Sequence, residues 1–310
     1  MPTISIIIPC YFNEENIPIT TEKLLNNEIL FEKDVNFQYI FIDDGSEDNT
    51  WQKLLDFKAI QPPNKVTLIK LSGNFGSYNA ILAGMKYAVG DCNVVISADL
   101  QDPPELIQKM YHYWEKGIKL IIANREDRKD PFLSKLFAKI FQKLVKKFAL
   151  NNLPEGGFDF VMFDQQLRNE VVLMNEKNTN TLYLFTWMKY DYVTIPYKRK
   201  EREVGKSRWT FKKKLKLFID SFVSFSFLPI RVITILGFLL GFISVVYSIF
   251  IIYGRVSGSI HIQGWSALMI VLLLVSSFQM IALGVLGEYI WRTLDAARNR
   301  PNYIIDKVEK

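Results

Sequence analysis

The sequence has only two cysteines, Cys10 and Cys92, and only two histidines, His112 and His261, in 310 residues. Two cysteines are too few for a disulfide framework and suit a reducing compartment, and the histidines lack partners at the spacing of a metal site. No G-x-G-x-x-G pattern follows the first strand-like run, and no G-x-x-x-x-G-K-[ST] loop is present. The first absence excludes a dinucleotide-binding oxidoreductase, and the second disfavours a kinase or an ATPase.

Charged side chains are missing from two long stretches near the C-terminus, Val232–Tyr253 and Trp265–Leu286. A helix of about 22 residues spans roughly 33 Å, which is enough to cross the hydrocarbon core of a bilayer. Core helices of soluble proteins are normally shorter and keep a polar stripe. We therefore predict two transmembrane helices.

A signal peptide is also lacking, because the apolar run Ser5–Pro9 is too short and no basic region precedes it. Lys198–Lys216 holds ten Lys or Arg against two acidic residues, whereas the connection Gly254–Gly264 has only Arg255 and His261. This asymmetry predicts a multi-pass protein of the cell membrane whose two termini face the cytoplasm. We expect the basic cluster, part of a net charge of +6, to lie against anionic headgroups rather than nucleic acid.

Short β-branched runs alternate with amphipathic stretches through the first half of the chain. Strands are predicted at Ile4–Ile8, Tyr39–Ile42, Val66–Leu71, Val94–Ser97 and Leu120–Ala123, and helices at Ile17–Asn27, Thr50–Ile60, Ser77–Val89 and Pro104–Lys116. We also predict a helix at Phe132–Leu150 and strands at Phe160–Phe163 and Tyr192–Pro196. The series indicates an α/β fold with a mainly parallel, Rossmann-like sheet and ligands at the carboxyl ends of its strands.

Four segments are predicted: a cytosolic domain at 1–209, a juxtamembrane amphipathic helix at 210–229, the two membrane helices within 230–287, and a cytosolic tail at 288–310. The second segment mixes lysines with Phe and Leu, which fits a helix in the membrane interface, broken at Pro229, or a connector packed on the soluble domain. Gly237 and Gly241 form a small-x-x-x-small pattern that packs helices within or between chains, so a homo-oligomer is left open.

Polar residues follow each of the first four predicted strands, at 9–15, 43–46, 72–76 and 98–105. Taken alone, Asp43-Asp44-Gly45-Ser46 is commonly a turn and a helix cap. Acidic residues at the ends of adjacent parallel strands, however, need a cation beside them. Mg²⁺ or Mn²⁺ carrying a diphosphate meets that need, and Asp99 is the best single ligand.

Together these motifs resemble family 2 glycosyltransferases; they are Ile6-Ile7-Ile8-Pro9 with Tyr11, Asn13 and Glu14, then Asp43-Asp44-Gly45-Ser46, Asn74-Phe75-Gly76 and Asp99-Leu100-Gln101-Asp102-Pro103-Pro104-Glu105. More narrowly, nearly the whole chain is similar to the polyprenyl-phosphate glycosyltransferases, the group of dolichol-phosphate mannose synthase and the bactoprenol glucosyltransferases. The resemblance implies a GT-A-type domain that uses Mg²⁺ or Mn²⁺. It also implies inverting transfer of one sugar from a nucleoside-diphosphate sugar, UDP-glucose or similar, to a polyprenyl phosphate such as undecaprenyl phosphate.

The resemblance assigns roles to individual residues. Donor binding is assigned to Pro9, Tyr11, Asn13, Glu14, Asp43, Asp44, Asn74, Ala98, Asp99 and Gln101, and the last two are also assigned to the metal. The acceptor phosphate is assigned to Arg125, Arg199, Arg202, Lys206 and Arg208. Catalytic roles are assigned to Asp99, Asp159 and Arg202.

Asp159 matches the position of the family's catalytic base. A phosphomonoester with a second pKa of about 6 is already largely dianionic at neutral pH. We therefore expect Asp159 to orient the acceptor or tune charge, and a turn residue beside two glycines is the alternative. Arg125 and Arg128 either contact phosphate or form an exposed pair with Glu126 and Asp127.

Four positions depart from the family pattern. Phe12 lengthens the first loop by one residue, and Gly73 and Ser77 stand where Arg and Lys are often found. Ser97 replaces the first Asp of an Asp-x-Asp pair, which leaves Asp99 as the sole certain carboxylate of the metal site.

Three other functions compete with a single-sugar transferase. A processive polysaccharide synthase needs a Q-x-x-R-W motif, but Gly205 stands where the Gln belongs before Arg208-Trp209. A catalytically silent membrane scaffold is disfavoured by the intact Asp43 and Asp99. A flippase would need more helices and intramembrane charges.

Overall fold

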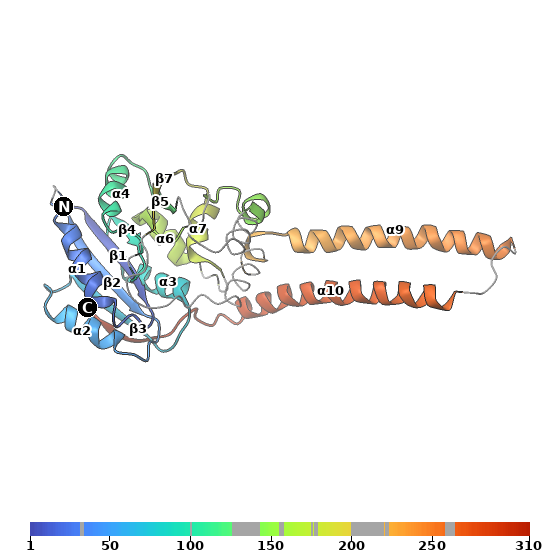
Figure 1. Cartoon of the computed structure of the whole chain (residues 1–310), viewed down its shortest axis with the longest axis horizontal. Helices are drawn as coiled ribbons and strands as arrows, with labels where there is room; N and C mark the ends of the chain where they lie inside the picture. Colours follow the sequence, from blue (N-terminus) through green and yellow to red (C-terminus); the bar gives the residue numbers. More distant parts are fainter. Residues whose placement is uncertain are drawn as a thin grey trace. The chain divides into compact units, whose positions relative to one another are not determined.

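The computed structural model describes residues 1–31, 34–99, 101–125, 143–154, 158–174, 176, 179–199, 220, 223–257 and 264–310. The chain divides into two compact units, Met1–Ser221 together with Pro301–Lys310, and Phe222–Arg300. The first unit is an α/β domain, and the second is a pair of long helices (Figure 1).

The helices and strands of the first unit alternate along the chain. They are β1 (Thr3–Cys10), α1 (Ile17–Glu28), β2 (Asn36–Asp43), α2 (Thr50–Ala59), β3 (Val66–Leu71), α3 (Ser77–Tyr87), β4 (Cys92–Val95), α4 (Leu106–Glu115), β5 (Leu120–Arg125), β6 (Val161–Asp164), α6 (Gln165–Leu173), α7 (Thr181–Trp187), β7 (Tyr192–Tyr197) and β8 (Ile305–Glu309). The predicted α/β fold is confirmed.

Eight strands form one mainly parallel sheet in the order β7-β5-β6-β4-β1-β2-β3-β8. β1 to β4 run parallel to one another, and β5 runs parallel to β7. β6 is antiparallel to both of its neighbours, and β8 is antiparallel to β3. The carboxyl ends of β1 to β4 therefore lie along one edge of the sheet, where α/β proteins bind ligands.

Helices cover both faces of this sheet (Figure 1). Ile4, Ile6 and Ile8 of β1 lie in the core shared with α1, α2 and α4. Ile7 points to the opposite face, which α3 covers, and Gly84 allows the close approach because an added Cβ would lie 2.7 Å from its Cγ2. Burial on both faces explains why β1 is a continuous apolar run rather than an alternating one.

The strands and helices predicted in the first half are all present, with ends that differ by a few residues. The strand predicted at Val94–Ser97 ends at Val95, so Ser97 belongs to the loop that follows. The predictions had not included α6, α7 or β8. Of the helix predicted at Phe132–Leu150, only residues from 143 onward are described, and 143–148 are helical.

The second unit consists of α9 (Leu228–Val256) and α10 (Trp265–Ala297). Leu228–Gly254 and Leu274–Ala297 are long and apolar enough to cross a membrane. Most of the helix predicted at 210–229 lies outside the described residues. Pro229 lies in the first turn of α9, where a missing N–H costs no helical hydrogen bond.

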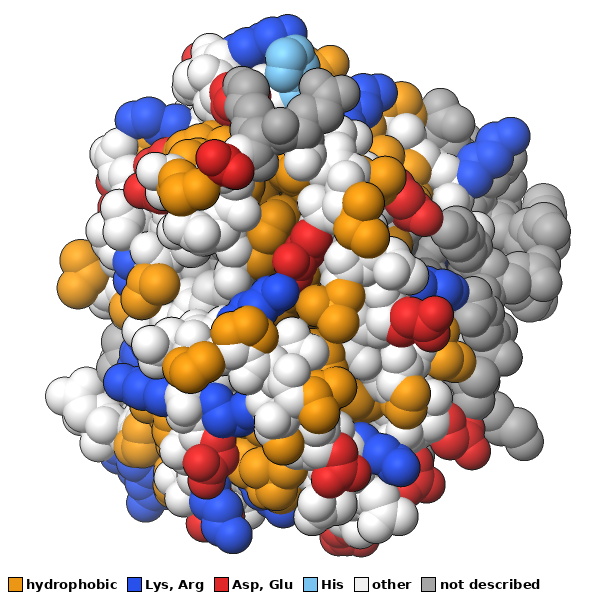
Figure 2. All heavy atoms as spheres, turned by 90° about the vertical axis from the view of Figure 1, so that its left-hand side faces the viewer, with side chains coloured by type: hydrophobic (Ala, Val, Ile, Leu, Met, Phe, Trp, Pro, Cys, Tyr) orange, Lys and Arg blue, Asp and Glu red, His pale blue; other side chains and the backbone are white. Residues whose placement is uncertain are grey.

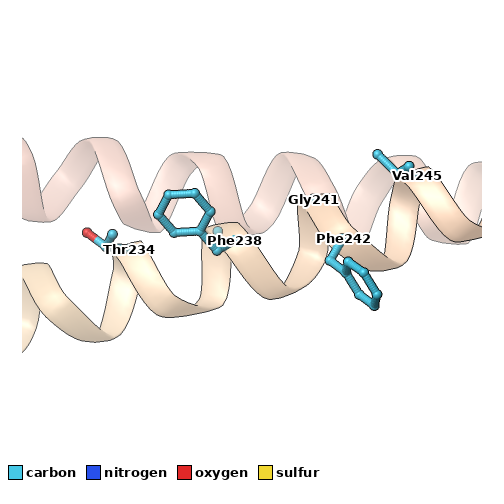
Figure 3. Close-up of a pocket in the computed structure, with 6 residues that line it drawn as sticks. Thr234, Phe238, Gly241, Phe242 and Val245 are labelled. Carbon is cyan, nitrogen blue, oxygen red and sulfur yellow. The ribbon is translucent and has the colours of Figure 1, made fainter.

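One face of α9 carries an open apolar groove of about 600 Å³, lined by Thr234, Gly237, Phe238, Gly241, Phe242 and Val245. Figure 3 shows Phe238 and Phe242 on successive turns of α9. The predicted small-x-x-x-small pair, Gly237 and Gly241, thus lies within this groove.

Candidate active site

The four polar loops predicted from the sequence lie at the carboxyl ends of β1, β2, β3 and β4. Cys10 at the end of β1 is the register partner of Asp43 at the end of β2, and Asp43 is in turn the partner of Lys70 in β3. The loops are therefore neighbours in space, as the sequence predicted.

Hydrogen bonds within the loop after β1, and between it and the loop after β2, organise this part of the site. Asn13 accepts a hydrogen bond at Oδ1 from the Tyr11 N–H, at 2.7 Å, and Glu14 accepts one from the Asn49 N–H beside the start of α2, at 2.9 Å. Phe12, the extra residue of this loop, has φ of 53° and donates its N–H to Ser46 Oγ. The left-handed backbone absorbs the insertion, and both Tyr11 and the half-buried Pro9 precede it in the chain.

Asp43 is fully buried at the end of β2. Its Oδ1 accepts the Ser46 N–H at 3.0 Å, whereas its Oδ2 is buried and has no hydrogen-bond partner among the described residues. Burial raises the pKa of Asp43, and hydrogen bonds from Ser46 and the charge of Lys70 oppose that rise. A buried acceptor without a donor is costly, so this oxygen is suited to an N–H or O–H of a ligand.

Asp44 joins two loops. Its carboxylate accepts hydrogen bonds from the backbone N–H groups of Phe75, at 2.7 Å, and Gly76, at 2.9 Å. Beside it, Gly45 has φ of +70°, and an added Cβ would overlap the backbone of Gly73. Asp44 and Gly45 therefore fix the loop that carries the exposed Asn74 against the end of β2.

Asp99 follows β4 in a partly exposed position. Its Oδ1 accepts hydrogen bonds from Ser97 Oγ, at 2.7 Å, and from the Gln101 N–H, at 3.3 Å. The neighbouring Ala98 is buried, and its carbonyl accepts the Thr20 hydroxyl of α1 at 2.6 Å. Asp99 is thus held at the edge of the solvent by a well-anchored backbone.

A divalent metal fits this loop only in part. Across the described ranges, no three His, Cys, Asp or Glu side chains converge on a point that could hold a metal. Asp99 is nevertheless a hard, accessible oxygen donor, and Mg²⁺ is often held by one or two carboxylates together with water and substrate phosphates. The donor set suits a metal that arrives with a diphosphate, with Asp99 and Gln101 as its protein ligands.

The contacts of Asp102 were not predicted from the sequence. Its side chain is fully buried, accepts a short hydrogen bond from the Tyr197 hydroxyl, and lies near the guanidinium groups of Arg125 and Arg199, at 4.0 and 3.7 Å. Ser97 Oγ is 3.3 Å from its other oxygen. Burial raises the pKa of Asp102, while both arginines and the hydrogen bond from Tyr197 oppose the rise.

Arg125 links Asp102 to Asp159. Its Nη2 lies 2.5 Å from Asp159 Oδ2, and its Nε donates to the Tyr197 hydroxyl at 3.1 Å. Burial lowers the pKa of Arg125, but Asp159 and Asp102 more than offset this and raise it. Arg125 and Asp159, predicted from distant parts of the chain, are therefore brought together; Arg128, Arg202, Lys206 and Arg208 lie outside the described residues.

Residues 5–175 match the profile of glycosyl transferase family 2. The chain is 36% identical over 304 residues to the uncharacterised glycosyltransferase YkcC of Bacillus subtilis (strain 168), covering 98% of this chain and 93% of that protein. It is 32% identical over 308 residues to a prophage bactoprenol glucosyl transferase homolog of Escherichia coli (strain K12), covering 99% of each.

The fold has a solved counterpart. Glucosyl-3-phosphoglycerate synthase from Mycobacterium tuberculosis, crystallised with Mn²⁺, UDP-glucose and phosphoglyceric acid, superposes with a TM-score of 0.51 at 14% identity, over 72% of this chain and 78% of that one. This likeness supports the GT-A-type fold, and the profile match together with the full-length relatives confirms the resemblance stated from the motifs. The chain belongs to glycosyl transferase family 2.

Proposed function

We propose that this glycosyltransferase moves a single hexose from a nucleoside-diphosphate sugar, such as UDP-glucose, to a polyprenyl phosphate, with inversion and at the cytosolic face of a membrane. The observation that carries the proposal is the division of charge along the edge of the sheet. Asp43 ends β2 and Asp99 follows β4, whereas Arg125 ends β5 and Arg199 follows β7, where Asp102 and Asp159 are the partners of the arginines. The relative named a bactoprenol glucosyl transferase homolog, matched along its whole length, supports the lipid acceptor.

The acidic side is suited to the donor. The unpartnered Oδ2 of Asp43 would accept a hydrogen bond from the base or ribose, and the loop held by Asp44 would flank it. Asp99 and Gln101 would hold Mg²⁺ or Mn²⁺, which when bound neutralises charge on the diphosphate. Tyr11, Asn13 and Glu14 stay predictions as direct donor contacts, since the contact described for Asn13 organises its own loop and that of Glu14 joins this loop to the start of α2.

The basic side is suited to the acceptor. Guanidinium groups bind phosphate oxygens through paired N–H donors, and Arg125 and Arg199 come from the ends of two adjacent parallel strands. A phosphate oxygen attacks the anomeric carbon as the bond from that carbon to the diphosphate breaks, and the nucleoside diphosphate leaves. Because the phosphate is already anionic, the reaction needs no strong base. The ion pair with Arg125 favours an orienting role for Asp159 over proton removal.

Two features support a membrane location with two spans. The first is the length and apolar character of Leu228–Gly254 and Leu274–Ala297. The second is β8, which follows α10 in the chain but pairs with β3 inside the α/β domain. Residues before α9 and after α10 must then lie on the same side of a membrane, so the intervening segment crosses it an even number of times.

The proposal is tested by incubating the purified chain, in lipid nanodiscs, with undecaprenyl phosphate, Mg²⁺ or Mn²⁺ and a panel of labelled UDP- and GDP-sugars. The expected product is a lipid that carries one sugar. Asp99→Ala should lower kcat by about 10²–10³-fold, the range found on removing one electrostatic stabiliser. A polymeric product, or no transfer from any sugar nucleotide, would overturn the proposal; full turnover by Asp99→Ala would overturn only the metal assignment.

A further inference from the structure

We propose that Asp102 is a positioning residue for the acceptor phosphate, an inference that rests on the function proposed above. Asp102 holds Arg125 and Arg199 in one cluster and connects them, through Ser97, to Asp99. The acceptor side of the site is therefore built on one buried carboxylate, and the donor side has only a longer contact with it, through Ser97.

Burial and position make Asp102 a fixed point. The side chain is 0% exposed, whereas Asp159, the other carboxylate that contacts Arg125, is 50% exposed. Asp102 also precedes Pro103 and Pro104, whose rings restrict the backbone directly before α4. Tyr197, which donates its hydroxyl to Asp102, is itself buried, with its ring edge-on to Phe160 at 6.3 Å between centroids.

The contacts of Asp102 divide between its two oxygens. Oδ1 accepts the Tyr197 hydroxyl and faces Nε of both Arg125 and Arg199. Oδ2 faces Ser97 Oγ, at 3.3 Å. The Tyr197 contact is a hydrogen bond, whereas the two arginine contacts, at 4.0 and 3.7 Å, are ion pairs that need no lone pair of their own. Asp102 thus orients two guanidinium groups that come from different strands.

Asp159 and Asp102, the two carboxylates beside Arg125, respond differently when a phosphate binds. The exposed Asp159 can be displaced into solvent, so the face of Arg125 that it occupies becomes available to the anion. Asp102 cannot leave, because nothing else described compensates the arginine charge in the interior, and an unpaired buried charge is strongly destabilising. Arg125 therefore keeps its orientation throughout binding, which is the condition for placing the phosphate accurately against the anomeric carbon.

Ser97 extends the cluster to the donor side. Its hydroxyl has one hydrogen and lies between two carboxylates, 2.7 Å from Asp99 Oδ1 and 3.3 Å from Asp102 Oδ2. An aspartate at this position would place a third carboxylate beside the other two. The serine instead joins Asp99 to the acceptor cluster without added repulsion.

The test compares Asp102→Asn and Tyr197→Phe with a matched control, Asp164→Asn. Asp164 is also a carboxylate at the end of a strand that accepts a hydrogen bond from an aromatic side chain, Trp114 Nε1 at 3.0 Å, but it lies outside the site. Turnover is measured at varied undecaprenyl phosphate and at varied sugar nucleotide, and the melting temperature is measured for each variant.

Asp102→Asn is expected to raise the KM for the lipid phosphate by about tenfold or more and the KM for the donor by less than about twofold. Tyr197→Phe should raise the KM for the lipid phosphate by about threefold and leave the KM for the donor nearly unchanged. Because this variant keeps its ring contact with Phe160, it tests the inference even where Asp102→Asn does not fold. Asp164→Asn should lower the melting temperature without raising the KM for the lipid phosphate relative to the KM for the donor. Equal changes in both KM values, or an unchanged KM for the lipid phosphate in a folded variant, would overturn the inference.

Direct binding of a short-chain prenyl phosphate to each folded protein separates this inference from the proposed function. Weaker binding to Asp102→Asn than to the unsubstituted chain supports the positioning role even where no sugar is transferred. Equal binding by the two proteins contradicts it even where transfer is observed.

Discussion

Three carboxylates at the edge of the sheet differ in what already occupies their oxygens. Asp44 is engaged by two backbone N–H groups, and Asp102 by Tyr197 and two arginines. Asp43 keeps one buried oxygen that has no hydrogen-bond partner within the part of the chain that the structure describes. The first two are therefore suited to hold the protein in place, and the third is suited to receive a ligand.

The unpartnered oxygen of Asp43 predicts a pH dependence of donor binding. Only the ionised carboxylate offers acceptors on both oxygens, and burial raises the pKa of this group. We expect the KM for the sugar nucleotide to rise as the pH falls through that raised pKa, and the profile to flatten in Asp43→Asn. A steady-state profile of both proteins, taken from neutral pH down to the lowest pH at which they stay folded, checks this; a flat profile in the unsubstituted chain would contradict it.

The same group has the opposite effect on stability. Because its pKa in the folded state lies above the unfolded value, the folded state binds more protons between the two values. The contribution of Asp43 to stability is present at low pH and is lost as the pH rises through the folded pKa. Donor binding and folding therefore place opposite demands on this residue, as expected for a site kept for function.

The sequence predicted that Asp43, Asp99, Arg125 and Asp159 belong to the site, because strand ends and motifs are local features. It did not predict the role of Asp102. Asp102 was visible in the run that follows Asp99, but its contacts with Tyr197 and Arg199 join positions about a hundred residues apart. The order of the strands in the sheet, β7-β5-β6-β4, brings the loop after β4 and the end of β7 to the same region.

At the scale of elements, the apolar runs of β1 to β4 and the amphipathic helices between them were predictable from periodicity. β8 was not, because Ile305–Glu309 is only five residues long and its two apolar residues, Ile305 and Val308, do not follow the alternation of a strand. Such a strand is specified by the free edge of β3 rather than by its own composition. The helices α6 and α7 are likewise short, at nine and seven residues, so few turns are available to show a helical period.

Gly45 predicts a measurable link between the loops after β2 and β3. Gly45→Ala adds a methyl group at φ +70° that overlaps the backbone of Gly73, so the loop carrying Asn74 must move. We expect a loss of about 1–3 kcal/mol in the free energy of unfolding and a higher KM for the donor. Gly76→Ala is the control, since Gly76 has φ of +91° but nothing within 4 Å of an added Cβ. If Gly45→Ala and Gly76→Ala have equal KM values for the donor, the link between the loops after β2 and β3 does not affect donor binding.

β8 predicts that the C-terminus stabilises the donor side of the sheet. Deleting 305–310 removes the ladder to Leu68–Leu71 but keeps the bond from the Ser72 N–H to the Ile304 carbonyl, at 3.0 Å. Deleting 302–310 removes that bond as well, together with the Tyr303 ring that lies 5.1 Å from Lys86 Nζ. At about 2–4 °C per kcal/mol for a domain of this size, both deletions should lower the melting temperature by several degrees.

The longer deletion should also raise the KM for the donor, because Ser72 begins the loop that Asp44 holds. Thermal unfolding in detergent and steady-state kinetics on the two truncated chains provide the comparison. An unchanged melting temperature in both would mean that β8 contributes nothing to the sheet.

The distribution of charge over the domain surface and along the chain indicates which kind of surface the whole molecule contacts. Figure 2 shows acidic and basic side chains interspersed over the face that it presents, with no extended patch of one sign among the described residues there. The basic excess of the sequence is instead concentrated in Lys198–Lys216, next to the helical unit in the chain. This distribution favours contact with an anionic membrane surface over binding to nucleic acid along the domain.

The pairing of β8 with β3 predicts the topology of the whole chain. Cys10 and Cys92 are both buried, so a membrane-impermeant maleimide should report on introduced cysteines in the folded protein. Glu47 and Asp306 are exposed and lie before and after the helical unit. We expect Glu47→Cys and Asp306→Cys to be protected in intact cells and labelled after permeabilisation, and Ser259→Cys, between the two apolar helices, to be labelled in intact cells. Labelling of Glu47→Cys and Asp306→Cys from opposite sides would require an odd number of crossings, which is incompatible with a strand after α10 in the same sheet as the N-terminal strand.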